Sequence, residues 1–122
     1  MRNEEGGISR LVINNKEIII IDYSDSNEDQ MIDILTETRK VVREENKPAR
    51  ILAIFNSRSF LTPKVMQVFN SDRLGRSLLE RQAAIGVSSI KKWIIDGHNT
   101  FHNNTIKVFE TKEDALDFLA GD

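Results

Sequence analysis

Two histidines form the simplest candidate for a metal site. His98 and His102 stand four residues apart, a spacing that places two imidazoles on one face of a helix, where both could bind the same ion. Glu is absent from the position after His98, and Asp96 is the one acidic residue near enough in sequence to act as a third ligand. We therefore interpret both as surface histidines and predict no metal site.

Serine and histidine together could also perform nucleophilic catalysis. Ser57 and Ser59 lie in a polar loop, and either histidine could act as their base, but such a pair needs an oriented third group. The sequence has no G-x-S-x-G motif, glycine-rich phosphate loop or dinucleotide fingerprint. It has no cysteine, which excludes disulfides, thiolate zinc sites and thiol catalysis. We expect a non-enzymatic protein without a cofactor, and a small hydrolase is the least favoured interpretation.

Charge is distributed unevenly along the chain. The sequence has 17 basic and 19 acidic residues, a net charge of −2, which argues against nucleic-acid binding. From Arg58 to Lys92, however, seven cations accompany two acids, and Phe60 and Trp93 lie in or beside this positive segment. Solvated helix surface is the simplest explanation; a small amphipathic or acidic ligand, or an anionic membrane surface, is the sharper alternative. The candidate ligand-binding residues are Asn56, Ser57, Arg58, Ser59, Phe60 and Trp93.

The strands that would position these residues are indicated by turn signals and apolar runs. Asn14-Asn15 predicts a tight turn between strands at Ile8–Ile13 and Glu17–Asp22. The second of these is apolar at consecutive positions, which indicates a central strand covered on both faces. Further buried strands are predicted at Arg50–Phe55, Ala83–Val87 and Ile106–Phe109.

Helices are predicted between these strands from their capping residues. Ser26 with Asp29 resembles a capping box for a first helix that ends at Asn46 to Pro48. Thr62 is a good cap for a second helix, and Pro63 suits its first position. The remaining predicted features are a core face at Met66 and Phe69 in the second helix, a third helix capped by Ser88 or Ser89, and a last helix capped by Thr111.

A glycine lies inside the predicted apolar stripe of the third helix. The stripe consists of Ile90, Ile94, Gly97 and Phe101. Glycine within a helix costs about 1 kcal/mol relative to alanine. We therefore infer that Gly97 approaches another element closely, with Gly86 as the candidate neighbour.

The alternation of strands and helices predicts an α/β fold. We expect one domain over residues 1–122, with five strands in a mostly parallel sheet, an antiparallel N-terminal hairpin strand and four helices. The first ten residues, MRNEEGGISR, contain four charged residues and no apolar run. The longest strictly aliphatic run in the sequence is Ile18–Ile21. We therefore expect neither a secretion signal nor a membrane span, and a cytoplasmic protein that is soluble or peripheral to the membrane.

Short motifs in a particular order add a family resemblance that covers nearly the whole chain. They are Lys16-Glu17-Ile18, Phe60-Leu61-Thr62-Pro63, Ala84-Ile85-Gly86-Val87, Ile90-Lys91-Lys92, Asn99-Thr100-Phe101, Ile106-Lys107-Val108-Phe109 and Thr111 to Leu119. In their order and spacing the chain resembles the SpoIIAA-like family, the STAS/CRAL-TRIO-type small domains of many bacteria. The resemblance implies a sheet built from successive strand-helix units. It also implies a non-enzymatic ligand-binding or regulatory domain, similar both to anti-sigma-factor antagonists and to lipid-carrying domains.

The antagonist branch of this family implies an alternative function. There a phosphorylatable serine follows the third strand in an Asp-Ser-Ser-Gly type of turn at the start of the second helix. Ser57 occupies the matching place, but Asn56 replaces the acid and the following glycine is missing, which argues against phosphoregulation. A phosphate on Ser57 would meet Arg58 and a helix N-terminus. A protein partner is thus the second interpretation. A homodimer is a further expectation, because the first strand could leave an edge or face exposed, but the sequence does not locate its interface.

Overall fold

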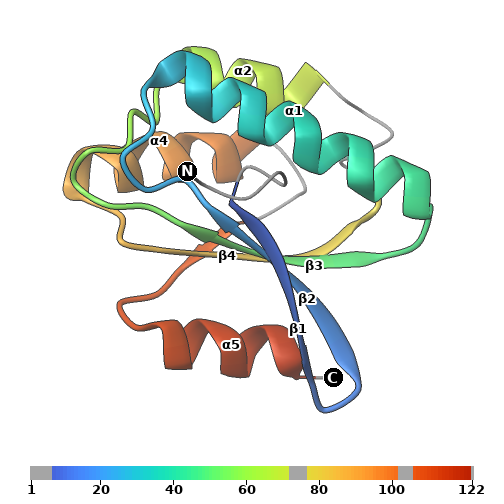
Figure 1. The fold of residues 1–122 in the computed structure, drawn as a ribbon. Helices are drawn as coiled ribbons and strands as arrows, with labels where there is room; N and C mark the ends of the chain where they lie inside the picture. The colour runs from blue at the N-terminus through green and yellow to red at the C-terminus, as the bar shows by residue number, and fades with distance from the viewer. Residues whose placement is uncertain (1–6, 72–76, 102–105, 122) are drawn as a thin grey trace.

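A five-stranded sheet forms the middle layer of the part of the chain that the structure describes (Figure 1). The structure is a computed structural model, and it describes residues 7–71, 77–101 and 106–121. The strands follow one another in space in chain order, from β1 to β5. The first pair is antiparallel and the others are parallel, as the sequence predicts. The strands are β1 (Ile8–Ile13), β2 (Lys16–Asp22), β3 (Ala49–Ile54), β4 (Leu79–Ile85) and β5 (Ile106–Val108).

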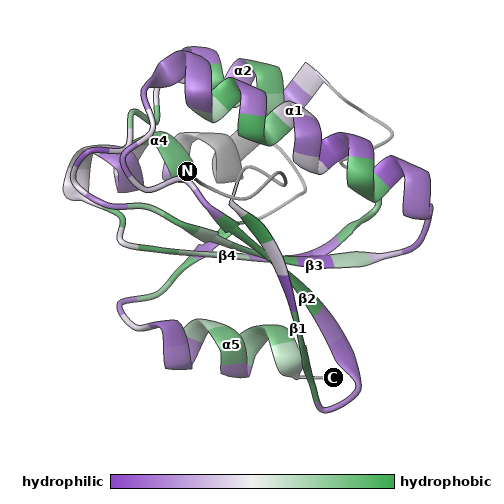
Figure 2. Ribbon diagram, viewed as in Figure 1, coloured by the Kyte–Doolittle hydropathy of each residue, from purple (hydrophilic) through white to green (hydrophobic). Residues whose placement is uncertain are grey.

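Helices cover both faces of the sheet. On one face lie α1 (Glu28–Glu45), α2 (Pro63–Ser71) and α4 (Ser89–Phe101), and on the other lies α5 (Lys112–Ala120) (Figure 1). Figure 2 shows hydrophobic residues along the strands between these two helical layers. None of the described helices is long and apolar enough to cross a membrane.

The β1–β2 hairpin confirms the turn that its two asparagines predict. Asn14 and Asn15 have φ values of 53° and 65°, so both central residues are left-handed, as a type I′ turn requires. In β2 the isoleucines alternate between the two layers: Ile19 and Ile21 pack under α1, whereas Ile18 and Ile20 pack against the α5 layer. The prediction of a central strand covered on both faces is therefore confirmed.

The start of α1 differs from the predicted cap. Asn27 is the N-cap, and its side chain accepts a hydrogen bond from Gln30 N, while Gln30 Oε1 accepts one from Asn27 N at 2.9 Å. Ser26 is buried instead, and its backbone oxygen accepts a hydrogen bond from Phe60 N at 3.0 Å. Ser26 is thus held by the loop after β3, and the N-cap lies one residue further along the chain than predicted. The other predicted caps, Thr62 and Thr111, are confirmed, and Ser88 is the cap of α4.

The region around the fourth strand needs three corrections. First, β4 begins at Leu79 and ends at Ile85, because its first half carries charged residues that pair with β3 and α5 rather than an apolar run. Secondly, α4 buries Lys91 and Ile95 rather than the predicted stripe; the side chains of Ile90 and Phe101 lie outside the described residues. Thirdly, a Cβ at Gly97 would meet nothing within 4 Å, so the inferred close approach there is wrong.

Gly86 is the residue of this region that does meet a close neighbour. It has a φ of 73°, and a Cβ at this position would lie 1.8 Å from the backbone oxygen of Phe55. Only glycine therefore fits where β4 turns into α4 beside the end of β3. This contact places the start of the loop after β3, at Phe55, beside the start of the loop after β4, at Gly86.

Candidate ligand-binding site

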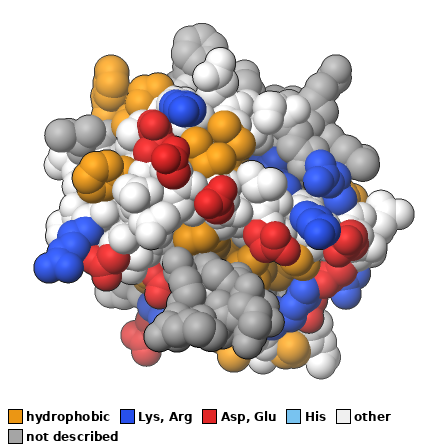
Figure 3. Space-filling model, turned by 45° about the horizontal axis from the view of Figure 1, so that its top comes forward, with side chains coloured by type: hydrophobic (Ala, Val, Ile, Leu, Met, Phe, Trp, Pro, Cys, Tyr) orange, Lys and Arg blue, Asp and Glu red, His pale blue; other side chains and the backbone are white. Residues whose placement is uncertain are grey.

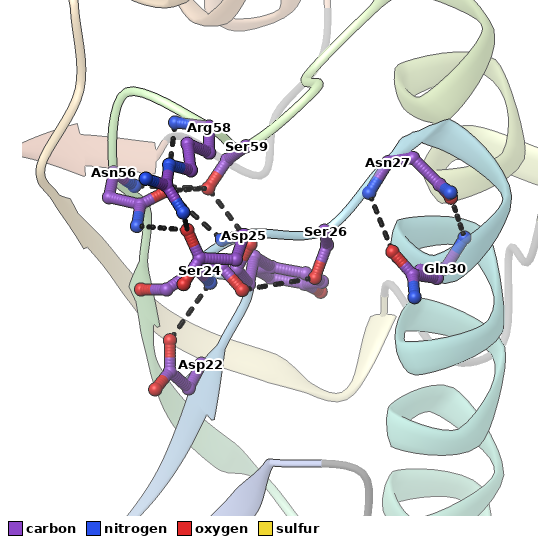
Figure 4. A network of polar contacts seen from close by, with 10 residues as sticks. Asp22, Ser24, Asp25, Ser26, Asn27, Gln30, Asn56, Arg58 and Ser59 are labelled. Atoms are coloured by element: carbon purple, nitrogen blue, oxygen red, sulfur yellow. Dashed lines mark hydrogen bonds and ion pairs between the residues drawn. The ribbon is translucent and has the colours of Figure 1, made fainter.

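The loop that follows β3 is held by hydrogen bonds to the loop that follows β2 (Figure 4). Asn56 Oδ1 accepts a hydrogen bond from Asp25 N at 3.0 Å, and Asn56 Nδ2 donates one to Asp25 Oδ1 at 3.0 Å. Ser59 Oγ donates to the backbone oxygen of Tyr23 at 2.8 Å. Asp25 itself has a left-handed φ of 59°, a conformation that this reciprocal pair supports. The loops thus form one rigid unit at the carboxyl end of β2 and β3.

Ser57 and Arg58 occupy the outward positions of this loop. Ser59 N donates to the backbone oxygen of Asn56 at 3.1 Å, which closes a tight turn with Ser57 and Arg58 at its centre. Both are exposed, and Arg58 Nη1 lies 3.7 Å from Asp25 Oδ1. This turn and residues 59–62 separate Ser57 from α2, which begins at Pro63 after the predicted cap Thr62.

The two predicted aromatic residues are both exposed. Trp93 is 76% exposed and Phe60 is 55% exposed, whereas their apolar neighbours Leu61 and Ile95 are buried. Of the six candidate residues, Asn56 and Ser59 hold the loop, Ser57 and Arg58 cap its turn, and Phe60 and Trp93 present aromatic surface. The structure does not gather all six into one pocket.

A groove of about 540 Å³ lies between α2 and α4, with Trp93 on its wall. Pro63, Met66 and Gln67 line it from α2, and Ile94 and Gly97 line it from α4. Small-molecule sites commonly have volumes of about 300–1,000 Å³, so the groove falls within that range. It brings Trp93 together with the first turns of α2. Of the six candidate residues only Trp93 lines it, and the loop Asn56 to Thr62, where the sequence places one side of the ligand site, does not.

An inner cavity of about 60 Å³ lies beneath the same helices. An engineered apolar cavity of about 150 Å³ holds benzene, so this one has room for only the narrow end of a ligand. Met66 lines both the groove and the cavity and is buried between them. The other walls of the cavity are largely apolar and include Ile21, Tyr23, Leu35, Ile51, Phe55, Leu61, Val65 and Ile95.

A tyrosine and an arginine add polar groups to this apolar cavity. Burial raises the pKa of Tyr23 above its ordinary value, although the nearby charge of Arg39 opposes the shift. The Tyr23 ring stacks on Phe55 with 5.2 Å between ring centroids. Arg39 Nη1 donates to the backbone oxygen of Phe69 at 3.0 Å, and its guanidinium lies 4.1 Å from the centre of the Phe69 ring. Both polar residues are thereby kept within the packed layer.

Charges on the helical face are balanced in space although they are unbalanced in sequence. Acidic and basic side chains are interspersed over this face, with hydrophobic ones between them (Figure 3). Three cations of the positive segment have acidic neighbours: Lys92 Nζ is 3.1 Å from Asp96 Oδ2, and Lys64 Nζ is 3.9 Å from Glu28 Oε1. The third, Arg58, faces Asp25 as described above. Three of the five described cations of this segment thus have an acidic neighbour, whereas Arg81 donates to Phe118 O and Lys91 is buried.

Comparison with solved structures identifies the fold. The chain is similar to a protein of the DUF3478 family from Shewanella loihica PV-4, which is described as uncharacterized and as having a SpoIIAA-like fold. The two share 16% sequence identity, the match covers 92% of this chain and 91% of that one, and the TM-score is 0.61. The fold is SpoIIAA-like. The resemblance inferred from the sequence is thus confirmed at the level of the fold. No family model matches the sequence, and no curated protein matches it.

The side chains of the two histidines, interpreted from the sequence as surface residues, fall outside what the structure describes. The side chain of His98 and all of His102 lie outside the described residues. Within the described residues no group of three or more His, Cys, Asp or Glu side chains could hold a metal ion. Ser59, one of the two candidate nucleophiles, donates its hydroxyl to a carbonyl oxygen rather than to a base.

Sequence reasoning missed two features of the candidate site. Tyr23, in the loop after β2, and Arg39, on α1, both line the cavity, and neither was among the predicted site residues. Met66 was predicted as core, but its position between two hollows depends on where α4 packs. The available signal for Arg39 was a cation inside the apolar periodicity of α1, next to Thr38 and one turn before Val42.

Proposed function

We propose that this protein is a non-catalytic domain that binds a small amphipathic ligand in the groove between α2 and α4. The observation that carries the proposal is the position of Met66, which alone among the described residues lines both the groove and the apolar cavity beneath it. Methionine is unbranched and flexible, so a change of its rotamer would admit the narrow apolar end of a ligand. The rest of the apolar part would lie on Trp93 and Ile94.

The polar end of the ligand would remain at the rim of the groove. Trp93 offers a large, exposed ring face, and Gln67 offers a side-chain amide that both donates and accepts hydrogen bonds. The cation on the same helix, Lys92, is bonded to Asp96. We therefore expect an uncharged polar group, such as an alcohol or an amide, to suit this rim better than a carboxylate.

The first experiment combines identification with direct binding. Native mass spectrometry of gently purified protein, followed by denaturing extraction, identifies any molecule that co-purifies. Trp93 is the only tryptophan in the sequence, so its fluorescence reports the groove directly. Titration with decanol, decanamide and decanoate should shift the emission to shorter wavelengths, with decanoate binding most weakly. Absence of both a co-purified molecule and any emission change would refute the proposal.

A pair of leucine variants localises the binding. Gly97→Leu places a side chain into the groove, and a Cβ there meets nothing within 4 Å, so the variant should fold. Glu44→Leu adds the same side chain to an exposed position near the end of α1 and is the matched control. We expect Gly97→Leu to weaken decanol binding at least tenfold and Glu44→Leu to leave it unchanged. Equal binding by both variants would place the ligand elsewhere.

Flotation with vesicles distinguishes binding of a small ligand from binding of a membrane surface. Neutral phosphatidylcholine vesicles and vesicles with added phosphatidylglycerol are compared, with Trp93→Ala as the variant. Because Arg58, Lys64 and Lys92 each have an acidic neighbour, we expect no flotation at either composition. Flotation that requires the anionic lipid and Trp93 would replace the small ligand by a membrane surface.

A second candidate function is a protein-binding domain of the antagonist type. The observation that favours it is the exposed Ser57 on a turn held by the Asn56–Asp25 pair, beside Arg58. A phosphate on Ser57 would compete with Asp25 for Arg58. Pull-down of partners with the wild-type protein and with Ser57→Asp tests this function, and equal recovery of every partner would count against it. Turnover of generic esters or phosphoesters that Ser57→Ala abolishes would instead indicate a hydrolase.

A further inference from the structure

The outer edge of β1 has hydrogen-bonding groups without a neighbouring strand. β1 is the first strand in the sheet order and pairs only with β2 among the described strands (Figure 1). Asp22 N donates to Gly7 O at 3.1 Å, which fixes which residues bond inward. Because inward and outward groups alternate in an antiparallel pair, the N–H and C=O groups of Ile8, Arg10 and Val12 point away from β2.

This edge lacks the features that usually protect an exposed strand. β1 contains no proline or lysine, and its six residues pair with β2 in an unbroken register. Its single charged residue, Arg10, forms ion pairs with Glu17, at 3.0 Å, and with Glu45 of the same chain. Val12 is 64% exposed and Leu11 is 37% exposed. The opposite edge, β5, is only three residues long and is protected by its shortness.

We propose that β1 pairs antiparallel with β1 of a second copy of this chain, with Leu11 on the two-fold axis. A two-fold axis perpendicular to the sheet places one residue opposite itself. Centring on Arg10 would set like charges opposite each other, and centring on Val12 would leave the start of the strand unpaired. Centring on Leu11 pairs Ser9 to Ile13 with the same residues of the second copy and places Arg10 of each copy opposite Val12 of the other.

Charge on one face of the sheet agrees with this register. Val12 lies opposite Glu17 on β2, so Glu17 and Arg10 of the second copy flank Val12 on the same face. The charges that stand on either side of Val12 in this register are therefore opposite in sign. A six-residue edge buries little area, so we expect a weak, concentration-dependent dimer rather than an obligate one.

Sedimentation of the full chain tests the dimer. Wild-type protein should sediment increasingly as a dimer as its concentration rises to about 1 mM, the scale at which weak interfaces assemble. Val12→Pro removes an outward N–H without removing any β1–β2 hydrogen bond, so it should remain folded and monomeric. Val12→Thr keeps that N–H and should dimerise as the wild type does. A monomeric wild type at every concentration, or a dimeric Val12→Pro, would overturn the proposal.

Disulfide trapping tests the register, because the sequence has no cysteine of its own. In the proposed dimer Leu11 faces its own copy in a pair without hydrogen bonds, where side chains approach most closely. Leu11→Cys should therefore form a disulfide-linked dimer under mild oxidation. Ser9→Cys lies on the same face but opposite Ile13 of the second copy, and should cross-link at least tenfold more slowly. Equal cross-linking of the two variants would refute the register.

Discussion

Two glycines of this protein have opposite roles, which substitution by alanine separates. At Gly86 the left-handed φ and the Phe55 backbone oxygen both oppose a Cβ, so Gly86→Ala should lower the free energy of unfolding by about 3 kcal/mol. Gly97 lies exposed within α4 with open space around it, so Gly97→Ala should raise that free energy by about 0.5–1 kcal/mol. Urea unfolding of the two variants measures both effects. A destabilising Gly97→Ala would restore the close approach inferred from the sequence.

Tyr23 makes stability depend on pH in the alkaline range. Burial raises the pKa of its phenol in the folded protein, so the folded state retains a proton that the unfolded state loses above about pH 10. The stabilisation is complete below that pH and should decrease by about 1.4 kcal/mol per pH unit above it. Tyr23 is the only tyrosine, so absorbance of the phenolate at 295 nm follows it alone.

The control for this titration is Tyr23→Phe. Its free energy of unfolding, measured in urea between pH 9 and pH 11, should lack the part of the slope that the phenol contributes. Phenolate absorbance in the wild type should rise only together with unfolding. A tyrosine that ionises near pH 10 while the protein stays folded would contradict its burial beneath α1.

Arg50 ties α5 to the sheet at the scale of elements. It lies buried on β3, and its Nη1 donates to Leu119 O at 2.6 Å and to Gly121 O, while Nε donates to Glu80 Oε1 at 2.9 Å. Arg50→Met would leave these carbonyls at the end of α5 without their donor, so we expect a loss of about 2–4 kcal/mol. Amide hydrogen exchange in α5 should accelerate. Glu80→Gln keeps both carbonyl contacts and should cost less than about 1 kcal/mol, because Glu80 is half exposed.

Local signals in the sequence located most elements, and contacts between distant residues account for the exceptions. Asn14-Asn15, Thr62-Pro63 and Thr111 each specify a turn or cap through their own side chains or backbone preference, so their elements begin where predicted. The first half of β4 was missed because Glu80 and Arg81 contact Arg50 and Phe118, partners that no local pattern contains. The cap of α1 was misplaced by one residue for the same reason.

The candidate site was predictable only in part. The sequence left Trp93 open between core and partly exposed surface, and the structure has it 76% exposed on the wall of the groove. Charge counted along the sequence was misleading, because Asp25 from the loop after β2 and Glu28 from the start of α1 face Arg58 and Lys64. A surplus within one segment says little about a surface when neighbouring elements supply the opposite charge.

At the scale of the whole molecule, one sheet serves two hydrophobic clusters. Alternate residues of β2 and neighbouring residues of β3 enter different layers, Ile51 beneath α1 and Leu52 against α5. Each helical layer buries its apolar face against the sheet, so the sheet is the apolar surface that both layers share. Loss of either layer would therefore expose one full face of the same strands to water.

This shared sheet predicts a single cooperative unfolding transition. Leu119 and Met31 are fully buried on opposite faces, so Leu119→Ala and Met31→Ala should each cost about 2–5 kcal/mol. Because the strands connect the clusters, both variants should unfold in urea in one step with the slope of the wild type. Circular dichroism and amide exchange of β2 and β3 should report the same midpoint. If Leu119→Ala instead unfolded α5 first, in a separate transition that left β2 protected, the α5 cluster would be an independent unit.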